Sequence, residues 1–361
     1  MATLNGLART GCTYKLPHTV WAPIYEPMIW WDLWIKSWPD ITQTTAWISP
    51  SAFGGVGLMK NADWALVISL GILWGMSFVF VELLLAYLSP FMIVYLRVAI
   101  GAFFLLAYIF IRKAAFDWSA ETILTLIIMA LLNNVVPFLL ITIGQQTTTG
   151  GLASILNANT AFVTIVLAAA LVPHETLTIN RVVGALIGVV GVTMAIGYQN
   201  IFQLFDGNSG KYLVLLATIS YALAGIWAKL KMQSMSPMIA ATGMLVMSTL
   251  ILTPYAFTFH FDELVSLDLV VIHYALAFAL FCSVIAYFLY FKILERTGAG
   301  NLLICTIIIP PSSILVNAIL LGEIITLAEM IGLAIITIGL LVLDGRIVNK
   351  ILKINRNIDK L

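Results

Sequence analysis

Ten apolar stretches, most of them about 20 residues long, dominate this sequence from residue 64 onward. They cover residues 64–86, 91–111, 121–143, 150–172, 181–198, 212–230, 237–257, 267–291, 299–320 and 327–345. A helix of about 20 residues crosses a hydrocarbon core of about 30 Å. Because lipid offers the backbone no hydrogen-bond partner, such stretches pair their amides internally, as helices. The sequence therefore predicts an all-α membrane protein with ten transmembrane helices.

Composition agrees with a membrane protein and argues against several other classes. Apolar residues make up 61% of the 361 residues and charged residues 10%, with a mean hydropathy of +1.03, whereas a soluble surface needs far more charge. The net charge of +1 argues against a nucleic-acid partner. Three scattered cysteines and four unclustered histidines indicate neither a disulfide framework nor a metal site. We expect the lipid bilayer and a small-molecule substrate as partners, no cofactor, and a monomer or homodimer.

Residues 1–58 differ from the rest of the chain, since they hold six of the ten tryptophans and no long apolar stretch. They lack the basic start and compact apolar segment of a signal peptide. Two interpretations stay open: an interfacial extension with tryptophans at headgroup level, or upstream sequence that is not native. We favour the second, with a native start at Met59. Two five-helix repeats would then cover residues 59–200 and 208–349, before a basic tail, 350–361.

Basic residues are distributed unequally between the two sides of the membrane. If the first helix starts in the cytoplasm, thirteen lysines and arginines belong to cytoplasmic segments and Lys211 alone to an external loop. Cytoplasmic loops of membrane proteins carry such an excess. With ten spans, an even number, both termini should face the cytoplasm, and we expect a bacterial inner (plasma) membrane.

The two halves of the apolar region repeat one another. The matches at an offset of 147 or 148 residues include Trp74 with Tyr221, Glu82 with Lys229, Ser89 with Ser236, and Glu175 with Glu323. Because each half has five helices, an odd number, the second half enters the membrane from the opposite side. Inverted repeats of this kind are typical of secondary transporters, although duplication can also be only a way to enlarge a bundle.

Three short segments carry a family pattern: Leu73-Trp74-Gly75-Met76-Ser77-Phe78, Gly151-Leu152-Ala153-Ser154, and Pro310 followed by Gly322-Glu323. Together they resemble the drug/metabolite transporter superfamily, EamA type. The resemblance implies a fold of five plus five helices and the transport of amino acids, other metabolites or drug-like solutes. Similar members are said to carry S-adenosylmethionine, so an exchanger for that or a nucleotide-type metabolite is the alternative.

The first half departs from this family pattern at two places, one of them Pro173-His174-Glu175, which stands where the second half has Leu-Gly-Glu. Phe162 stands in the first half where the second half has Pro310. Since proline removes a helical hydrogen bond, we expect a kink near Pro310 and none in the matching helix of the first half.

Glu82 and Arg97 are the most deeply placed charges of the chain. Each lies seven to eight positions from the turn at Ser89 and Pro90, which puts both about 11 Å from that turn along their helices. A lone charge there costs several kcal/mol, so we predict that the two form a buried pair. The pair would either fix the hairpin structurally or act in gating and coupling near the external mouth.

Eight polar or aromatic residues are candidates for binding substrate near the midplane, between the halves: Trp74, Asn134, Asn157, Thr160, Tyr221, Ser283, Tyr287 and Thr306. Amides and hydroxyls are costly in hydrocarbon and should face the bundle interior. Hydrogen bonding between helices is the alternative explanation for them. The aromatic faces and Glu82 would suit a cationic or zwitterionic solute such as an amino acid.

Two further patterns predict structural roles. Gly184, Gly188, Gly332 and Gly339 indicate close helix packing. Glu175 and Glu323 stand at the starts of the fifth and tenth helices, and we interpret them as caps that meet the helix dipoles.

Enzyme and energy-coupling motifs are missing from the sequence. Gly210-Lys211-Tyr212 lacks the Ser or Thr of a P-loop, and His174-Glu175 lacks the second histidine of a zinc protease. We therefore predict no enzymatic activity and a secondary transporter that works by alternating access. An intramembrane enzyme would need a catalytic constellation, and a channel would favour a ring of like residues over a two-fold repeat, so both are less favoured.

Overall fold

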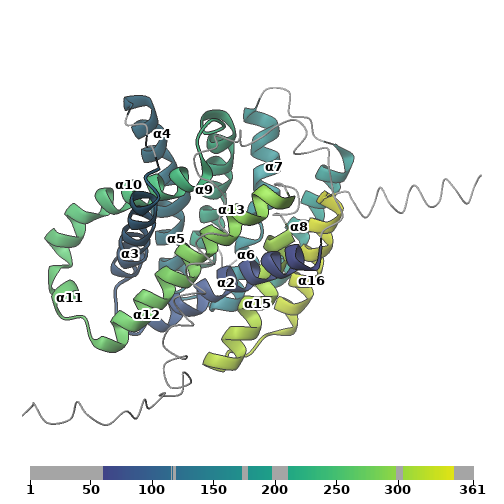
Figure 1. The fold of residues 1–361 in the computed structure, drawn as a ribbon. Coiled ribbons are helices and arrows are strands. Elements are labelled where there is room, and N and C mark those ends of the chain that lie inside the picture. The colour runs from purple at the N-terminus through teal and green to yellow at the C-terminus, as the bar shows by residue number, and fades with distance from the viewer. Residues whose placement is uncertain are drawn as a thin grey trace, which may run out of the picture. The chain divides into compact units, whose positions relative to one another are not determined.

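The computed structural model describes residues 60–114, 116, 119–172, 178–196, 210–297 and 304–344, and within these ranges every regular element is a helix (Figure 1). The extension 1–58, Glu175 and the tail 350–361 lie outside the described residues, so the expectations about them stay predictions.

The first half of the apolar region forms five spans. They are α2 (Asn61–Leu85), α3 (Pro90–Ile111), α4 (Ala120–Ala130) continued by the π-helical η2 (Leu131–Val135) and α5 (Val136–Gly144), α6 (Gly150–Asn157) followed by α7 (Thr160–Leu171), and α8 (Ile179–Ile196).

The second half forms the same series. It comprises α9 (Gly210–Lys231), α10 (Pro237–Phe259) with the short α11 (Phe261–Val265), α12 (Leu269–Ala279) continued by the π-helical η5 (Leu280–Ile285) and α13 (Ala286–Thr297), α15 (Ile304–Leu321), and α16 (Leu327–Asp344). Nine helices of the described chain are long and apolar enough to cross a membrane, and a shorter apolar helix, Leu327–Leu343, supplies the tenth. The predicted all-α fold of ten helices is confirmed.

Several helices begin where the sequence supplies a cap. The hydroxyls of Ser89, Ser119 and Thr149 each accept a hydrogen bond from the backbone amide three residues further on. Such a hydroxyl satisfies one of the amides that the first helical turn leaves unpaired. Pro90 follows Ser89 at the first helical position, where its missing N–H costs nothing. These caps fix where the helices start, so the ends predicted from the sequence fall close to the observed ones.

A π-helical segment interrupts the third span of each repeat at matching places. Leu131 and Leu280, where η2 and η5 begin, are 149 positions apart, close to the offset of the sequence repeat. A π segment inserts a residue into the helical turn and occurs frequently at functional sites. The duplication thus extends to a local irregularity, which hydropathy alone does not reveal.

Helix packing follows a two-fold pattern in which each contact has a partner with the repeats exchanged. Helix α2 packs on α15 and α13, as α9 packs on α7 and α5. Helix α3 packs on α12 and η5, as α10 packs on α4 and η2. Helices α8 and α16, which match each other, pack together. Since each repeat has five spans, this pattern is that of two inverted repeats.

The glycines of α8 and α16 allow these two helices to touch. A Cβ atom at Gly184 would lie 2.8 Å from the Gly339 carbonyl oxygen, and one at Gly191 would lie 3.0 Å from that of Gly332. Backbone atoms cannot move away from such a contact, so larger residues would separate the helices. The close packing predicted from the glycines is confirmed.

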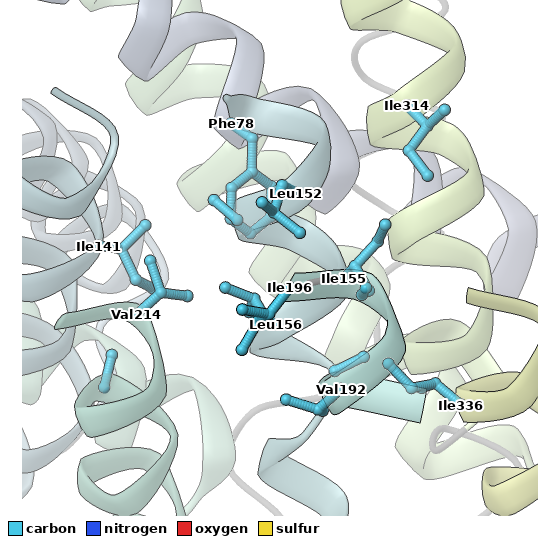
Figure 2. Close-up of a cluster of buried hydrophobic side chains, with 14 of the residues drawn as sticks. Phe78, Ile141, Leu152, Ile155, Leu156, Val192, Ile196, Val214, Ile314 and Ile336 are labelled. Atoms are coloured by element: carbon cyan, nitrogen blue, oxygen red, sulfur yellow. The ribbon is translucent and has the colours of Figure 1, made fainter. Parts of the chain in front are cut away.

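An apolar cluster of described residues joins both repeats around α6. It includes Phe78 of α2, Leu156 of α6, Val192 of α8, Val214 of α9 and Ile336 of α16 (Figure 2). Since lipid is as apolar as these side chains, dispersion and close packing hold such a cluster together more than exclusion of water does.

The fourth span of the first repeat is interrupted, where no kink was predicted, and the kink near Pro310 stays a prediction. Helix α15 runs without a break through Pro310 and Pro311, whereas the matching span of the first repeat divides into α6 and α7 at Ala158 and Asn159. There the Thr160 hydroxyl donates to the Asn157 carbonyl at 2.7 Å, competing for an acceptor that a helix uses for its amides.

Candidate functional site

Arg97 of α3 reaches from the first repeat into the π segment of the second. Its Nε donates to Ser283 Oγ at 3.2 Å, and its Nη2 lies 3.5 Å from the Cys282 carbonyl oxygen, which accepts from it. A π segment disturbs the regular helical hydrogen bonding and leaves carbonyls available to side chains. The local irregularity of η5 therefore creates the acceptor that holds the guanidinium.

Two phenylalanine rings cover the guanidinium of Arg97. Its Cζ lies 3.9 Å from the ring centroid of Phe138 on α5 and 4.6 Å from that of Phe278 on α12. Each distance is within the range of a cation–π interaction, which strengthens where water is excluded. The site thus holds a cation with apolar rings as well as with hydrogen bonds.

Tyrosines complete the surroundings of Arg97. Tyr221 of α9 and Tyr287 of α13 are close enough to interact electrostatically with the guanidinium, and both are only partly buried. Trp74 of α2 packs at a centroid distance of 6.0 Å against Tyr290, which in turn neighbours Tyr287. The structure therefore brings three of the eight substrate candidates, Ser283, Tyr221 and Tyr287, to Arg97, while Trp74 lies further out, against Tyr290.

The predicted pair of Glu82 and Arg97 is wrong. Glu82 Oε2 accepts from the backbone amide of Gly150 at 3.0 Å, while Arg97 donates to η5. The two residues sit on helices whose main partners differ, because α2 packs chiefly on α15 and α3 chiefly on α10. Equal depth along two helices, as counted from the sequence, does not fix the direction in which a side chain points.

Glu82 belongs to a polar cluster at the start of α6. Glu323, from the second repeat, accepts from the next amide, that of Gly151, at 3.2 Å. Carboxylates from both repeats therefore bind consecutive N–H groups at one helix N-terminus, where the dipole favours negative charge. A Cβ atom at Gly150 would lie within 3.0 Å of Glu82 and Asn317, so only glycine admits this close approach.

The role predicted for Glu323 is also corrected. It caps α6 of the opposite repeat rather than α16, which begins only at Leu327. The start of α16 is closed instead by reciprocal hydrogen bonds in which Thr326 N donates to Glu329 Oε2 and Glu329 N to Thr326 Oγ1. This is a capping box, which sequence spacing can predict.

Asn317 and Ser313 of α15 extend the polar cluster. Ser313 Oγ donates to the Gly150 carbonyl at 3.3 Å, and Asn317 Nδ2 donates to the Ser313 carbonyl at 2.8 Å. Asn317 is fully buried, and its Oδ1 has no hydrogen-bond partner. Charged and polar groups from α2, α15 and the segment before α16 thus converge on the first turn of α6.

The remaining four substrate candidates are not among the residues that interact with Arg97. Asn134 of η2 is fully buried and donates to Ser248 Oγ of α10 at 3.1 Å. Asn157, whose Oδ1 has no partner, and Thr160 flank the break between α6 and α7, and Thr306 lies on α15. The contact of Asn134 is the hydrogen bond between helices that the sequence left open as an alternative, and a role for these residues in substrate binding stays a prediction.

A corner outside the spans joins the start of α3 to α11. Glu263 accepts from the Ser89 amide at 3.0 Å and bonds the His260 ring at 2.8 Å. Partial burial alone would raise the pKa of Glu263, but these hydrogen bonds outweigh it and hold that pKa below its ordinary value. The corner links the two repeats at the end of the bundle where α2 finishes.

Comparison with known proteins assigns the family. The model of the EamA-like transporter family matches residues 64–197 and 208–343, once for each repeat. The chain belongs to the EamA-like transporter family. The resemblance seen in the sequence is confirmed, and this EamA-like protein is an integral membrane transporter.

Relatives of this EamA-like transporter match along most of their length. An "Uncharacterized transporter" of Archaeoglobus fulgidus is 25% identical over 74% of this chain and 93% of the relative. "Uncharacterized transporter YoaV" of Bacillus subtilis is 22% identical over 76% and 94%. A "Probable amino-acid metabolite efflux pump" of Salmonella typhimurium is 26% identical over 78% and 94%.

A solved crystal structure has the same fold. It superposes with a TM-score of 0.58 at 15% identity and covers 81% of this chain and 99% of the other. At this identity the likeness concerns the fold alone.

Several residues of the EamA-like site were not selected from the sequence. Asn317 and Ser313 are polar residues within an apolar stretch, and that signal was available. Glu323 was found by the repeat but assigned to the wrong helix. Phe138 and Phe278 carry no signal of their own, because phenylalanine is common throughout apolar helices.

Proposed function

We propose that this EamA-like protein is a secondary transporter that carries a small organic solute by alternating access, with the solute bound between the repeats. The bacterial inner membrane and cytoplasmic termini are part of the proposal and rest on the excess of basic residues on one side. A relative that bears the name of an amino-acid metabolite efflux pump supports amino acids or related metabolites as the solute class.

The observation that carries the proposal is the closure at the start of α6. Glu82 and Glu323 come from different repeats and bind the consecutive amides of Gly150 and Gly151. The Glu323 bond to Gly151 joins the two repeats, so relative movement of the repeats would break it, while Glu82 holds the same helix end from within the first repeat. We propose that this closure is the gate at one side of the membrane.

The closure contrasts with the permanent contact of α8 and α16. That interface consists of backbone approaching backbone at Gly184 and Gly339, and separating it would expose a long tight surface. A transporter needs both kinds of contact, since one must hold the repeats together while the other opens. We assign the gating role to Glu82 and Glu323, which replaces the predicted gating pair of Glu82 and Arg97.

Counterflow in liposomes tests the proposal. Purified protein is reconstituted into vesicles loaded with an unlabelled mixture of L-amino acids, and uptake of the same labelled compounds is followed. A carrier accumulates label against its gradient, whereas a channel does not. The Glu82→Ala, Glu323→Ala double variant should slow exchange by about tenfold or more, because each charge-assisted hydrogen bond contributes about 1.5–3 kcal/mol to the closed state.

Glu121→Ala is the matched control for this experiment. Glu121 is an exposed glutamate in the first turn of α4, so it loses the same charge away from the closure and should exchange at the wild-type rate. Equal exchange by the double variant and the control would contradict the gate. Passive equilibration of label without overshoot would contradict the carrier mechanism itself.

A further inference from the structure

We propose that Arg97 binds a carboxylate group of the transported solute. This inference rests on the proposed transport function and narrows its solute class to organic acids, amino acids included. It departs from the cationic solutes that Glu82 suggested, because Glu82 is engaged at the start of α6.

The charge of Arg97 has no acidic counterpart in the described chain. The groups that interact with it are Ser283, the Cys282 backbone and thiol, two phenylalanine rings and two tyrosines. Arginine stays protonated in proteins, and a cation within a membrane span costs several kcal/mol unless it is paired. Arg296, by contrast, has a carboxylate partner, with its Nε 2.7 Å from Asp63 Oδ1. An anionic group of the solute would supply the negative charge that the described chain does not place beside Arg97.

The guanidinium also has hydrogen-bond donors to spare. It carries five N–H groups, and the structure uses one on Nε and one on Nη2. The two N–H groups in use lie on the edge formed by Nε and Nη2. The N–H groups on the edge formed by Nη1 and Nη2 are therefore available to a ligand. The rings of Phe138 and Phe278 cover the guanidinium face and leave approach in its plane. That edge matches the two oxygens of a carboxylate, which arginine binds through parallel hydrogen bonds.

The tyrosines supply further donors from the opposite repeat. Tyr221 and Tyr287 interact electrostatically with Arg97, so their hydroxyls lie near an anion bound to the guanidinium. Arg97 belongs to the first repeat, whereas both tyrosines belong to the second. A carboxylate bound here would contact both repeats at once, as a solute must when the repeats move around it.

Comparison of the two repeats indicates that packing against a π segment does not require the charge of Arg97. At the offset of 147 residues Arg97 falls on Met244, beside the equivalent segment η2. There Asn133 Nδ2 approaches Met244 Sδ at 3.6 Å and no charge is involved. A neutral side chain therefore suffices to pack a π segment in this fold, so the charge of Arg97 calls for another explanation.

Matched pairs of acids and amides test the proposal on the purified full-length protein. The probes are L-leucine with L-leucinamide, L-phenylalanine with L-phenylalaninamide, and glutarate with glutaramide. Binding is measured from the ligand-dependent shift of the melting temperature and transport from counterflow. We expect the wild type to bind and exchange at least one acid and to bind its amide at least tenfold more weakly. Arg97→Met should lose at least tenfold in affinity for that acid, while Arg97→Lys should lose less.

Lys231→Gln is the charge-matched control, because Lys231 is an exposed cation at the end of α9. The Lys231→Gln variant should bind the acid with the affinity of the wild type. Acid binding retained in both Arg97 variants, or equal binding of acid and amide by the wild type, would overturn the proposal and leave the transport function standing. If wild-type protein exchanges amides or amines but no acid, the proposal is likewise wrong and the carrier function is supported. Absence of exchange for every probe would count against both. Should Arg97→Met fail to fold, the acid-to-amide ratio of the wild type and the Arg97→Lys variant still decide the matter.

Discussion

The two repeats build the same junction with opposite chemistry. In one, Arg97 of α3 meets Cys282 and Ser283 of η5. In the other, Met244 and Ser248 of α10 meet Asn133 and Asn134 of η2. The sequence offsets of 147 for the helices and 149 for the π segments relate these junctions. One junction is neutral and closed by hydrogen bonds between helices, whereas the other holds a cation that has no acidic partner among the described residues.

This difference teaches where to look for function in a duplicated fold. Features that both repeats share, such as the π segments and the α8–α16 contact, follow from the duplicated architecture. Features that one repeat has and the other lacks are not required by the architecture. Arg97 is such a feature, and so is the paired closure by Glu82 and Glu323, since Glu82 falls on Lys229 in the repeat.

Placing a charge at the neutral junction should have the largest effect. Met244 is buried, so Met244→Arg adds a cation without an acid or the partners of Arg97. We expect a loss of about 3 kcal/mol or more, or no folded protein. Met244→Leu, which keeps the volume, should cost less than about 1.5 kcal/mol. Monodispersity and the melting temperature in detergent measure the stability of both variants. Equal stability of Met244→Arg and Met244→Leu would contradict a tightly packed junction around Met244.

A side chain at Gly75 should have the next largest effect. A Cβ atom there would lie 2.9 Å from the Ile309 carbonyl oxygen and the Ser313 amide of α15, so Gly75→Leu must push α2 and α15 apart. We expect a loss of about 1–3 kcal/mol, read as a lower melting temperature. Gly225 of α9 is exposed with open space around it, so Gly225→Ala should not destabilise. A stable Gly75→Leu protein would mean that α2 and α15 are not in contact.

Asn134→Leu should weaken the neutral junction moderately. The change removes a fully buried hydrogen bond to Ser248, and such bonds between membrane helices contribute about 0.6–2 kcal/mol. If Asn134 binds substrate, as the sequence suggested, this variant would reduce substrate binding with the fold intact; the buried contact predicts lost stability instead. Melting temperature and acid affinity, measured together, separate the two. Unchanged stability with lost affinity would restore the first interpretation.

Tyr287→Phe should weaken acid binding at the charged junction, that of Arg97 with η5. Tyr287 falls on Phe138 at the offset of 149 residues, so the change makes the two repeats alike there. Removing one hydroxyl donor should weaken acid binding by about threefold to tenfold without lowering the melting temperature. The measurement is a titration of L-leucine against wild type and variant. An affinity equal to that of the wild type would remove Tyr287 from the site.

The smallest effect concerns pH at the corner of Ser89 and Glu263. Because the pKa of Glu263 is held below its ordinary value of 4.5, its contribution to stability is present above about pH 4.5 and is lost as the pH falls through the lower, folded-state value. Since the group is partly exposed, we expect the melting temperature to fall by about 1–2 °C. Glu263→Gln should lack this component between pH 6 and pH 3.5. The same fall in the variant would assign it to other carboxylates.

The sequence predicted the class, the helices and the repeat, because apolar length and loop chemistry decide these locally. The partners of Glu82 and Arg97 were not predictable in the same way. Counting along a helix gives depth, but direction depends on which helix packs alongside, and the main partners of α2 and α3 differ. The π segments add a second obstacle, since each inserts a residue into the turn and rotates every later side chain, including Ser283 and Tyr287, relative to a regular helix.

Opening of the closure at α6 is the movement on which the whole account depends, and a distance measurement across it is the most direct test. Spin labels at Gln146, before α6, and Ile324, beside Glu323, would occupy exposed positions on its two sides. Double electron–electron resonance in lipid nanodiscs then compares wild type with the Glu82→Gln, Glu323→Gln variant, with Glu121→Gln as control. The account predicts two distance populations, the longer one enriched in the double variant and unchanged in the control. A single distance, identical in all three proteins, would contradict it.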